Sequence, residues 1–249
     1  GAPLNNVLYN GVALPDVWPP RNIGMNYDPM PTPYLINRPE IIPIDLGRQL
    51  LVDNFLIEQT DMERRSYTPR KMSFNPVLKP ETELEQGIYG IPGASAKDGG
   101  VWWDPKDQLF KMWYEAGWLN KMAYATSNDG VNWVRPDLNN GSNELLTLSR
   151  FPANSCAVVL DYEASDNERY KMFLRSPNAD ATDNAGYCMI SSNGKQWSWF
   201  TKTGPCGDRS TMFYNPFRKK WVFSIRTLGV LGNSPHGRAR YYREHSDFL

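Results

Sequence analysis

Histidine and cysteine, two residue types that carry much of enzyme chemistry, are scarce in this chain of 249 residues. His236 and His245 are its only imidazoles, which argues against a zinc site and against Ser–His–Asp catalysis. The three cysteines, Cys156, Cys188 and Cys206, are odd in number and have no C-x-x-C spacing. We expect them to be small buried side chains, and we predict neither a metal site nor a cofactor.

The composition excludes some partners and favours others. The 27 Lys and Arg residues balance 27 Asp and Glu residues, so no net charge attracts a nucleic acid or an anionic membrane. The chain has 9 Trp, 13 Tyr and 10 Phe. Most of these aromatic side chains are needed for packing between sheets, and the remainder suit a carbohydrate partner, because the apolar face of a sugar packs on an aromatic ring.

Neither a membrane helix nor a signal peptide is visible in the sequence. No run approaches the roughly twenty apolar residues of a membrane helix. The start at Gly1-Ala2-Pro3 has no basic region and no apolar region of a signal peptide. The protein is therefore expected to be either cytosolic or secreted with its signal already removed.

One pattern of strand, polar turn and strand occurs three times, at Val101–Tyr114, Ala157–Leu174 and Thr211–Ser224. The first two copies continue into a further strand that ends in a shared signature, Ser127–Trp133 and Ser191–Trp197. Short antiparallel strands in a repeat of about fifty to sixty residues are typical of successive blades of a β-propeller. We therefore predict an all-β fold in which residues 88–249 form three blade-like antiparallel units, the last one incomplete.

The strand pattern also predicts which side chains are structural. We expect Trp103, Trp113, Trp133 and Trp197 to be largely buried between sheets. The signature turns and the residues Asp104, Asp161 and Asn215 are interpreted as turn elements without a catalytic role.

The chain divides in composition near residue 43. Eight prolines between Pro15 and Pro43 predict an extended arm over residues 1–43, and residues 44–249 are predicted to be the N-terminal part of a propeller domain. The sequence stops at Leu249, where a fourth strand of the third unit is expected. Because a closed propeller needs at least four blades, we expect another chain or a symmetry mate to cover the open edge.

The repeats, the lead-in Asn75–Leu78, the Ser-x-Asp-Gly-x-x-Trp turn and the tract Gly207–Pro216 carry a family resemblance. Together they resemble the five-bladed propeller glycosidases, the superfamily of invertases, arabinanases and xylosidases in glycoside hydrolase families 32 and 43. The similarity covers about residues 45–249. It implies a five-bladed β-propeller of which this chain carries about three blades, and a periplasmic or extracellular location.

In enzymes of that superfamily the reacting carboxylates lie on the innermost strands of different blades and point into a central funnel. The resemblance therefore directs attention to the starts of the first strands, where Asp98, Asn154 and the pair Asp208–Arg209 stand. A glycosidase needs one carboxylic acid that protonates the leaving oxygen and one carboxylate that acts as base or nucleophile. Asp98 and Asp208 are the catalytic candidates, and Arg209, Glu115 and Asn154 are the substrate-binding candidates.

Alternatives stay open for these residues. Asp98 is also interpretable as a loop residue beside Gly99, and Asp208 as a cap next to Gly207. Arg209 is equally interpretable as a structural partner of Asp208. The general-acid glutamate of related enzymes usually comes from a later blade, which we do not expect in this chain.

The leading hypothesis is a glycoside hydrolase, or its N-terminal half, that acts on a plant or microbial glycan. A glycoside phosphorylase is the first alternative, and it would need a basic pocket for phosphate, with Arg209 and Arg226 as candidates. A non-catalytic carbohydrate-binding propeller is the second alternative, since Asn154 stands where an acid would be expected.

Overall fold

The structure is a computed structural model, which describes Val17, Ile36 and residues 40–42, 44, 50–96, 98, 100–149, 155–177, 184–226 and 239–249. The chain divides into two units, Gly1–Lys71 and Met72–Leu249. Most of the predicted proline-rich arm at 1–43 lies outside the described residues, so that arm stays a prediction. Residues 50–71 contain neither helix nor strand. No helix within the described ranges is long and apolar enough to cross a membrane.

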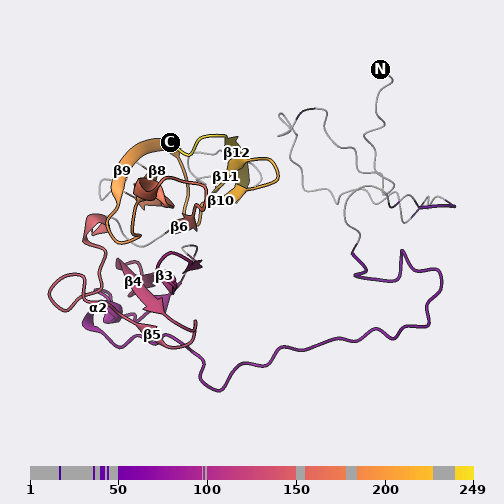
Figure 1. The fold of residues 1–249 in the computed structure, drawn as a ribbon, viewed down its shortest axis with the longest axis horizontal. Coiled ribbons are helices and arrows are strands. Elements are labelled where there is room, and N and C mark those ends of the chain that lie inside the picture. Colours follow the sequence, from indigo (N-terminus) through magenta and orange to yellow (C-terminus); the bar gives the residue numbers. More distant parts are fainter. Residues whose placement is uncertain are drawn as a thin grey trace. The chain divides into compact units, whose positions relative to one another are not determined.

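The second unit is built almost entirely from β-strands, which form three antiparallel sheets (Figure 1). Sheet I contains β1 (Ala94–Ser95), β2 (Val101–Asp104), β3 (Leu109–Ala116), β4 (Lys121–Ser127) and β5 (Trp133–Val134). Sheet II contains β6 (Ser155–Leu160), β7 (Tyr170–Pro177), β8 (Asn184–Ser191) and β9 (Ser198–Pro205). Sheet III contains β10 (Thr211–Asn215), β11 (Lys220–Arg226) and β12 (Arg240–His245). The helices of the described part of this unit are short: the α-helix α2 (Glu83–Gln86) and the 3₁₀ helices η1 (Leu146–Leu148) and η2 (Asp166–Glu168).

Strand pairing follows the sequence repeats. In sheets II and III each strand pairs with the strand that precedes it in the sequence. In sheet I, β1 and β2 both pair with β3, at Glu115–Ala116 and Leu109–Met112 respectively, so they act as two parts of one first strand. The prediction that strands pair within each repeat is confirmed for the described residues.

Polar side chains at the ends of the first strands form the hairpin turns. In each turn a side-chain oxygen accepts a hydrogen bond from the backbone nitrogen two residues later, which fixes a tight reversal. The pairs are Asp104 with Lys106 at 2.9 Å, Asp161 with Glu163 at 3.1 Å and Asn215 with Phe217 at 3.1 Å. The predicted turn role of these three residues is confirmed, although Asp104 also has a second role described below.

The two signature turns share one hydrogen-bond pattern. In the first turn, Ser127 Oγ accepts from Gly130 N at 2.9 Å, and Trp133 Nε1 donates to Gly130 O at 3.1 Å. The second turn repeats both bonds at the same distances with Ser191, Gly194 and Trp197. Each turn thus satisfies its own backbone groups, which confirms that the signature is a structural element.

Sheet II is apolar on both faces. All residues of β6 are buried. Because side chains alternate along a strand, Cys156 and Val158 lie in one core with Trp113 of sheet I. Ala157 lies in the other core with Trp221 of sheet III. The sheets therefore stack face to face in sequence order.

The opposite face of sheet I is covered by the segment that precedes it. Tyr114 and the small side chains of β3 and β4 pack there against Leu78 and Leu84. This cover leaves Trp133 partly exposed, and Trp103, which contacts Phe110, is also partly exposed. Trp113 and Trp197 are 0% and 6% exposed, which confirms their predicted burial, whereas Trp103 and Trp133 are buried only in part. These two lie where no second sheet covers sheet I.

Gly194 offers a test of the contact between sheets I and II. Its φ is +75°, and a Cβ at this position would lie 2.5 Å from Cζ2 of the buried Trp113, whose indole nitrogen donates to Gly194 O at 2.7 Å. Gly130 has the same φ of +75°, but its nearest neighbour, Phe110, would be 3.8 Å away. We expect Gly194→Ala to lower the free energy of unfolding by about 1–3 kcal/mol more than Gly130→Ala does. Denaturant unfolding measures both variants, and equal losses would contradict the stacking described here.

Candidate active site

The first strands of the three sheets lie side by side, with β2 beside β6 and β6 beside β10. Their starting ends come together. Arg209, two residues before β10, donates its backbone nitrogen to Ser155 Oγ at the start of β6. The Arg209 Nη2 atom lies 3.5 Å from Asp98 Oδ1, and Asp98 precedes β2. One residue from each repeat thus meets at the same end of the stack.

The turn before β10 is fixed by its own hydrogen bonds. Ser210 Oγ donates to Gly207 O at 2.8 Å and accepts from Arg226 N at 2.9 Å. Gly207 N donates to Arg226 O at 2.9 Å. These bonds hold Arg209 at a φ of +58°, in the left-handed region that a residue with a side chain seldom occupies. Backbone strain of this kind concentrates at functional sites, which makes this turn a candidate.

Two carboxylate–arginine pairs form at this end. Asp98 faces Arg209, and Asp208 Oδ1 pairs with Arg226 Nη1. The Asp98 side chain is 19% exposed, and no described residue donates a hydrogen bond to its buried Oδ2 atom. Burial, followed by the nearby charge of Asp98, raises the pKa of the Cys156 thiol. Cys156 is accordingly a neutral, buried side chain behind the site.

The remaining sequence candidates are placed as follows. Glu115, near the end of β3, is 4% exposed, and its Oε1 accepts from Leu119 N at 2.6 Å. This bond ties Glu115 into the turn after β3. Asn154 lies outside the described residues. The structure therefore brings Asp98, Asp208 and Arg209 to one region, while the substrate-binding role of Glu115 stays a prediction.

The other end of the first strands holds a buried ion cluster that the sequence did not reveal. Asp104 is fully buried, and its Oδ2 accepts from Lys111 Nζ at 2.7 Å and from the Tyr170 hydroxyl. Its Oδ1 accepts from Arg169 Nη2 at 2.5 Å. Burial raises the pKa of Asp104, but the bonds from Arg169, Lys111 and Tyr170 outweigh it and hold that pKa below its usual range. Burial raises the pKa of Tyr170, as does its bond to Asp104.

A second buried carboxylate, Glu85 of α2, is also fully paired. Its Oε1 accepts from the Tyr114 hydroxyl and from Arg135 Nε, both at 2.7 Å. Its Oε2 accepts from the backbone nitrogens of Glu81 and Thr82 at 2.7 and 2.9 Å. Burial raises the pKa of Glu85, and these hydrogen bonds, the one from Arg135 foremost, lower it below its usual value. Every oxygen is satisfied, so Glu85 anchors the covering segment and is a structural residue.

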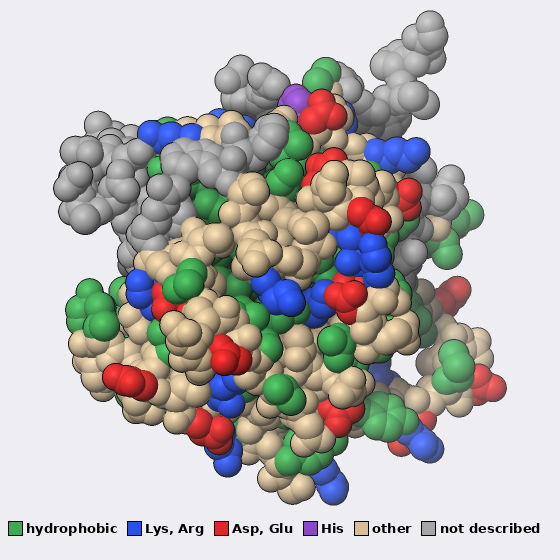
Figure 2. Space-filling model, turned by 60° about the vertical axis from the view of Figure 1, so that its left-hand side comes forward, with side chains coloured by type: hydrophobic (Ala, Val, Ile, Leu, Met, Phe, Trp, Pro, Cys, Tyr) green, Lys and Arg blue, Asp and Glu red, His purple; other side chains and the backbone are tan. Residues whose placement is uncertain are grey.

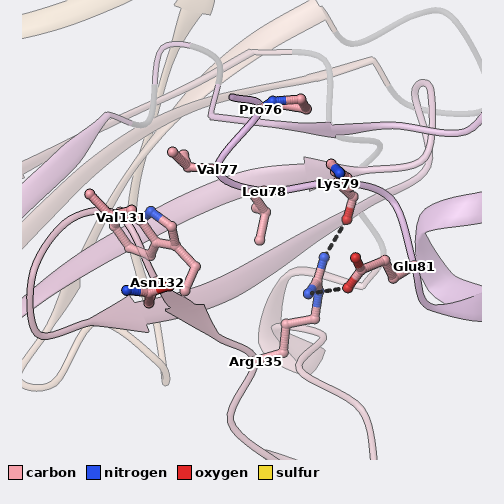
Figure 3. Close-up of a pocket in the computed structure, with 9 residues that line it drawn as sticks. Pro76, Val77, Leu78, Lys79, Glu81, Val131, Asn132 and Arg135 are labelled. Carbon is pink, nitrogen blue, oxygen red and sulfur yellow. Dashed lines mark hydrogen bonds and ion pairs between the residues drawn. The ribbon is translucent and has the colours of Figure 1, made fainter. Parts of the chain in front are cut away.

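A pocket near β5 is separate from the candidate site. It is lined by residues 76–79, Glu81, residues 131–133 and Arg135 (Figure 3). Arg135 is already paired there with Glu81 Oε2 and donates to Lys79 O. None of the sequence candidates lines this pocket. Among the described residues, no group of His, Cys, Asp and Glu has the arrangement of a metal site.

No family model and no curated protein matches this chain. Solved structures with partial likeness include two kinds of glycosidase. A putative exo-β-1,3-galactanase from Bifidobacterium bifidum has a TM-score of 0.42 and 12% identity, over 67% of this chain and 54% of that one. A β-fructofuranosidase from Schwanniomyces occidentalis has a TM-score of 0.39 and 15% identity, over 54% of this chain and 31% of that one. An exo-β-1,3-galactanase from Phanerochaete chrysosporium has a TM-score of 0.38 and 13% identity, over 66% of this chain and 41% of that one.

The likeness covers about a third to just over a half of each of these solved structures. At this TM-score and identity it assigns no role to any residue of this chain.

The lowered pKa of Asp104 predicts how the stability of the protein depends on pH. Its pKa is lowered in the folded protein, so its contribution to stability is complete above the ordinary Asp value of about 3.9 and is lost as the pH falls below it. We expect Asp104→Asn to cost about 3–5 kcal/mol at pH 7, because Lys111 and Arg169 lose their buried counter-charge. We also expect the variant to lose less stability than the wild type between pH 5 and 2. Denaturant unfolding at several pH values measures both effects.

Asp166→Asn is the matched control, because Asp166 pairs with Lys106 on an exposed surface, where its side chain is 79% exposed. Its unfolding curve at pH 7 should resemble that of the wild type. An Asp104→Asn protein as stable as this control at pH 7 would refute the structural role of the cluster.

Proposed function

We propose that this chain is part of a glycoside hydrolase that acts on a plant or microbial glycan. In this proposal sheets I to III are three blades of a five-bladed propeller. The face-to-face stacking of the sheets and the contact between their first strands support that architecture. The likeness of the sequence repeats to propeller glycosidases supports the class of reaction.

The observation that carries the proposal is the meeting of Asp98, Arg209 and the neighbouring Asp208 at the starts of the first strands. Glycoside hydrolysis requires a carboxylate beside the anomeric carbon, where positive charge develops in the transition state. Two partly exposed carboxylates meet this requirement: Asp98 is held by Arg209 of the fixed turn, and Asp208 is held by Arg226 at the end of β11. The clusters around Asp104 and Glu85 do not, because their carboxylates are buried and fully paired.

The two aspartates take different roles in the proposed mechanism. Arg209 holds Oδ1 of Asp98 and leaves Oδ2 without a donor among the described residues. The Asp98 carboxylate, 19% exposed, is the proposed nucleophile or base: it attacks the anomeric carbon as the glycosidic bond breaks, or it accepts a proton from the attacking water. The leaving oxygen then takes its proton from a general acid that we expect in a later blade. Asp208 supplies negative charge close to the developing positive charge. Arg226 and Arg209 position these carboxylates, and Arg209 is 46% exposed, which leaves it accessible to a substrate hydroxyl.

The ion pairs favour hydrolysis over phosphorolysis. A phosphorylase needs cations that are available to bind phosphate. Arg209 and Arg226 already face Asp98 and Asp208, so phosphate would have to displace a carboxylate from either one. Water is neutral, so it can attack without displacing a carboxylate from either arginine.

The test uses the intact protein that contains this chain, with Asp98→Asn and Asp208→Asn as separate variants. We expect each to lower the rate of sugar release from an accepted glycan by about 10²–10⁴-fold, because an amide keeps the shape but cannot carry the charge. Asp161→Asn is the control, because Asp161 lies in the turn after β6, at the far end from Ser155. Thermal unfolding curves should show that all three variants are folded at the assay temperature.

Two outcomes would overturn the proposal. One is unchanged hydrolysis by a folded Asp98→Asn protein. The other is a sugar phosphate as the product when inorganic phosphate is supplied, which would assign the chain to a phosphorylase.

A further inference from the structure

Four large apolar side chains stand exposed on two adjacent segments at the start of sheet I. The segment 87–93 leads into β1, and the turn 117–120 follows β3. The exposed fractions are 73% for Ile88, 64% for Tyr89, 50% for Ile91 and 49% for Trp118. Adjacent exposed apolar side chains of this size mark a binding surface more often than an unused one.

The two segments are locked to each other through their backbones. Gly117 N donates to Gly93 O at 2.9 Å, and Trp118 N donates to Ile91 O at 3.1 Å. Gly87 and Gly117 have φ values of +71° and +74°, and a Cβ on Gly117 would lie 2.5 Å from Gly87 Cα. Both glycines are therefore required for this close approach. The surface, which we call the Trp118 platform, is preorganised, so a ligand pays little conformational entropy to bind it.

The platform lies at the end of sheet I where its first strand begins. β1 pairs with the last residues of β3, so the segments before β1 and after β3 meet at this end. Asp98 lies in the turn between β1 and β2 and follows Ile91 by seven positions in the sequence. The Cα atoms of these two residues are therefore at most about 25 Å apart. The platform is thus close enough to contact a chain molecule whose reacting bond lies at Asp98.

The chemistry of the platform selects a neutral ligand. Residues 87–93 and 116–120 contain no charged side chain. The face of the molecule shown in Figure 2 also carries acidic and basic side chains intermixed, without a large region of one sign. Aromatic and aliphatic side chains on segments without a charged side chain match the C–H face of a neutral pyranose or furanose ring, while a polyuronide would gain no ion pair with these segments.

We propose that the Trp118 platform binds neutral sugar units of an oligo- or polysaccharide beyond the unit held at Asp98. The substrate is then a glycan chain of several neutral units. This inference rests on the proposed function for the position of the reacting bond. Binding to the platform itself is measured without any reaction.

The experiment is affinity electrophoresis of the intact protein in native gels that contain arabinan, xylan, β-1,3-galactan or an inulin-type fructan, with polygalacturonate as the anionic comparison. We expect at least one neutral polysaccharide to retard the wild type. Trp118→Ala and Tyr89→Ala should weaken that binding about fivefold each, a magnitude typical of a lost aromatic contact. Trp118→Phe should retain most of the binding, because it keeps a ring.

Phe217→Ala is the matched control, because Phe217 is 90% exposed in the turn between β10 and β11 at the far end of sheet III. It should be retarded like the wild type. The proposal is overturned if no neutral polysaccharide retards the wild type, if Trp118→Ala is retarded as strongly as Phe217→Ala, or if polygalacturonate binds best. It is also overturned if Trp118→Ala turns a dimer into a monomer in gel filtration, because the surface is then a contact between copies.

The catalytic variant separates this inference from the proposed function. Retardation that depends on Trp118 and persists in Asp98→Asn supports the platform, whether or not the wild type hydrolyses the glycan. Hydrolysis that depends on Asp98, together with retardation indifferent to Trp118, supports the enzyme and refutes the platform.

Discussion

The structure depends on one constraint, the need of sheet II to bury both of its faces. Every residue of β6 is buried, and successive side chains of this strand enter different cores. A strand of this kind is stable only when a sheet covers each side, because exposed apolar surface costs about 25 cal/mol per Å². Sheets I and III supply these covers through Trp113 and Trp221. Their stacking in turn places the three first strands next to one another.

The two ends of these strands are used differently. At one end Asp104 is buried, and Lys111, Arg169 and Tyr170 satisfy its oxygens, which ties sheet I to sheet II. At the other end the carboxylates are partly exposed, and Oδ2 of Asp98 accepts no hydrogen bond from a described residue. A buried carboxylate with every oxygen paired stabilises a fold, whereas a partly exposed carboxylate can be reached by a ligand. Asp104, at the end of β2, is thus a structural residue, and Asp98, in the turn between β1 and β2, is the catalytic candidate.

Rigid surroundings make the exposed end suitable for a site. Ser210 and Arg226 fix the turn that holds Arg209 in a left-handed conformation. Gly87 and Gly117 fix the segments of the Trp118 platform at the start of sheet I. Both devices place side chains by backbone hydrogen bonds and steric contact, so little flexibility is lost when a ligand binds.

The sequence by itself determined the local elements: the repeated strands, the Asx turns at Asp161 and Asn215, and the signature turns. These depend on hydrogen bonds between residues two or three positions apart and on the two-residue alternation of strands. Only the tertiary structure decided which faces are covered, and therefore that Trp133 is less buried than Trp113. The cluster around Asp104 was missed because Arg169 lies 65 positions away. The contact of Arg209 with Asp98 likewise depends on sheet stacking. Local chemistry sets the strands and turns, while the packing of apolar faces decides which distant charges meet.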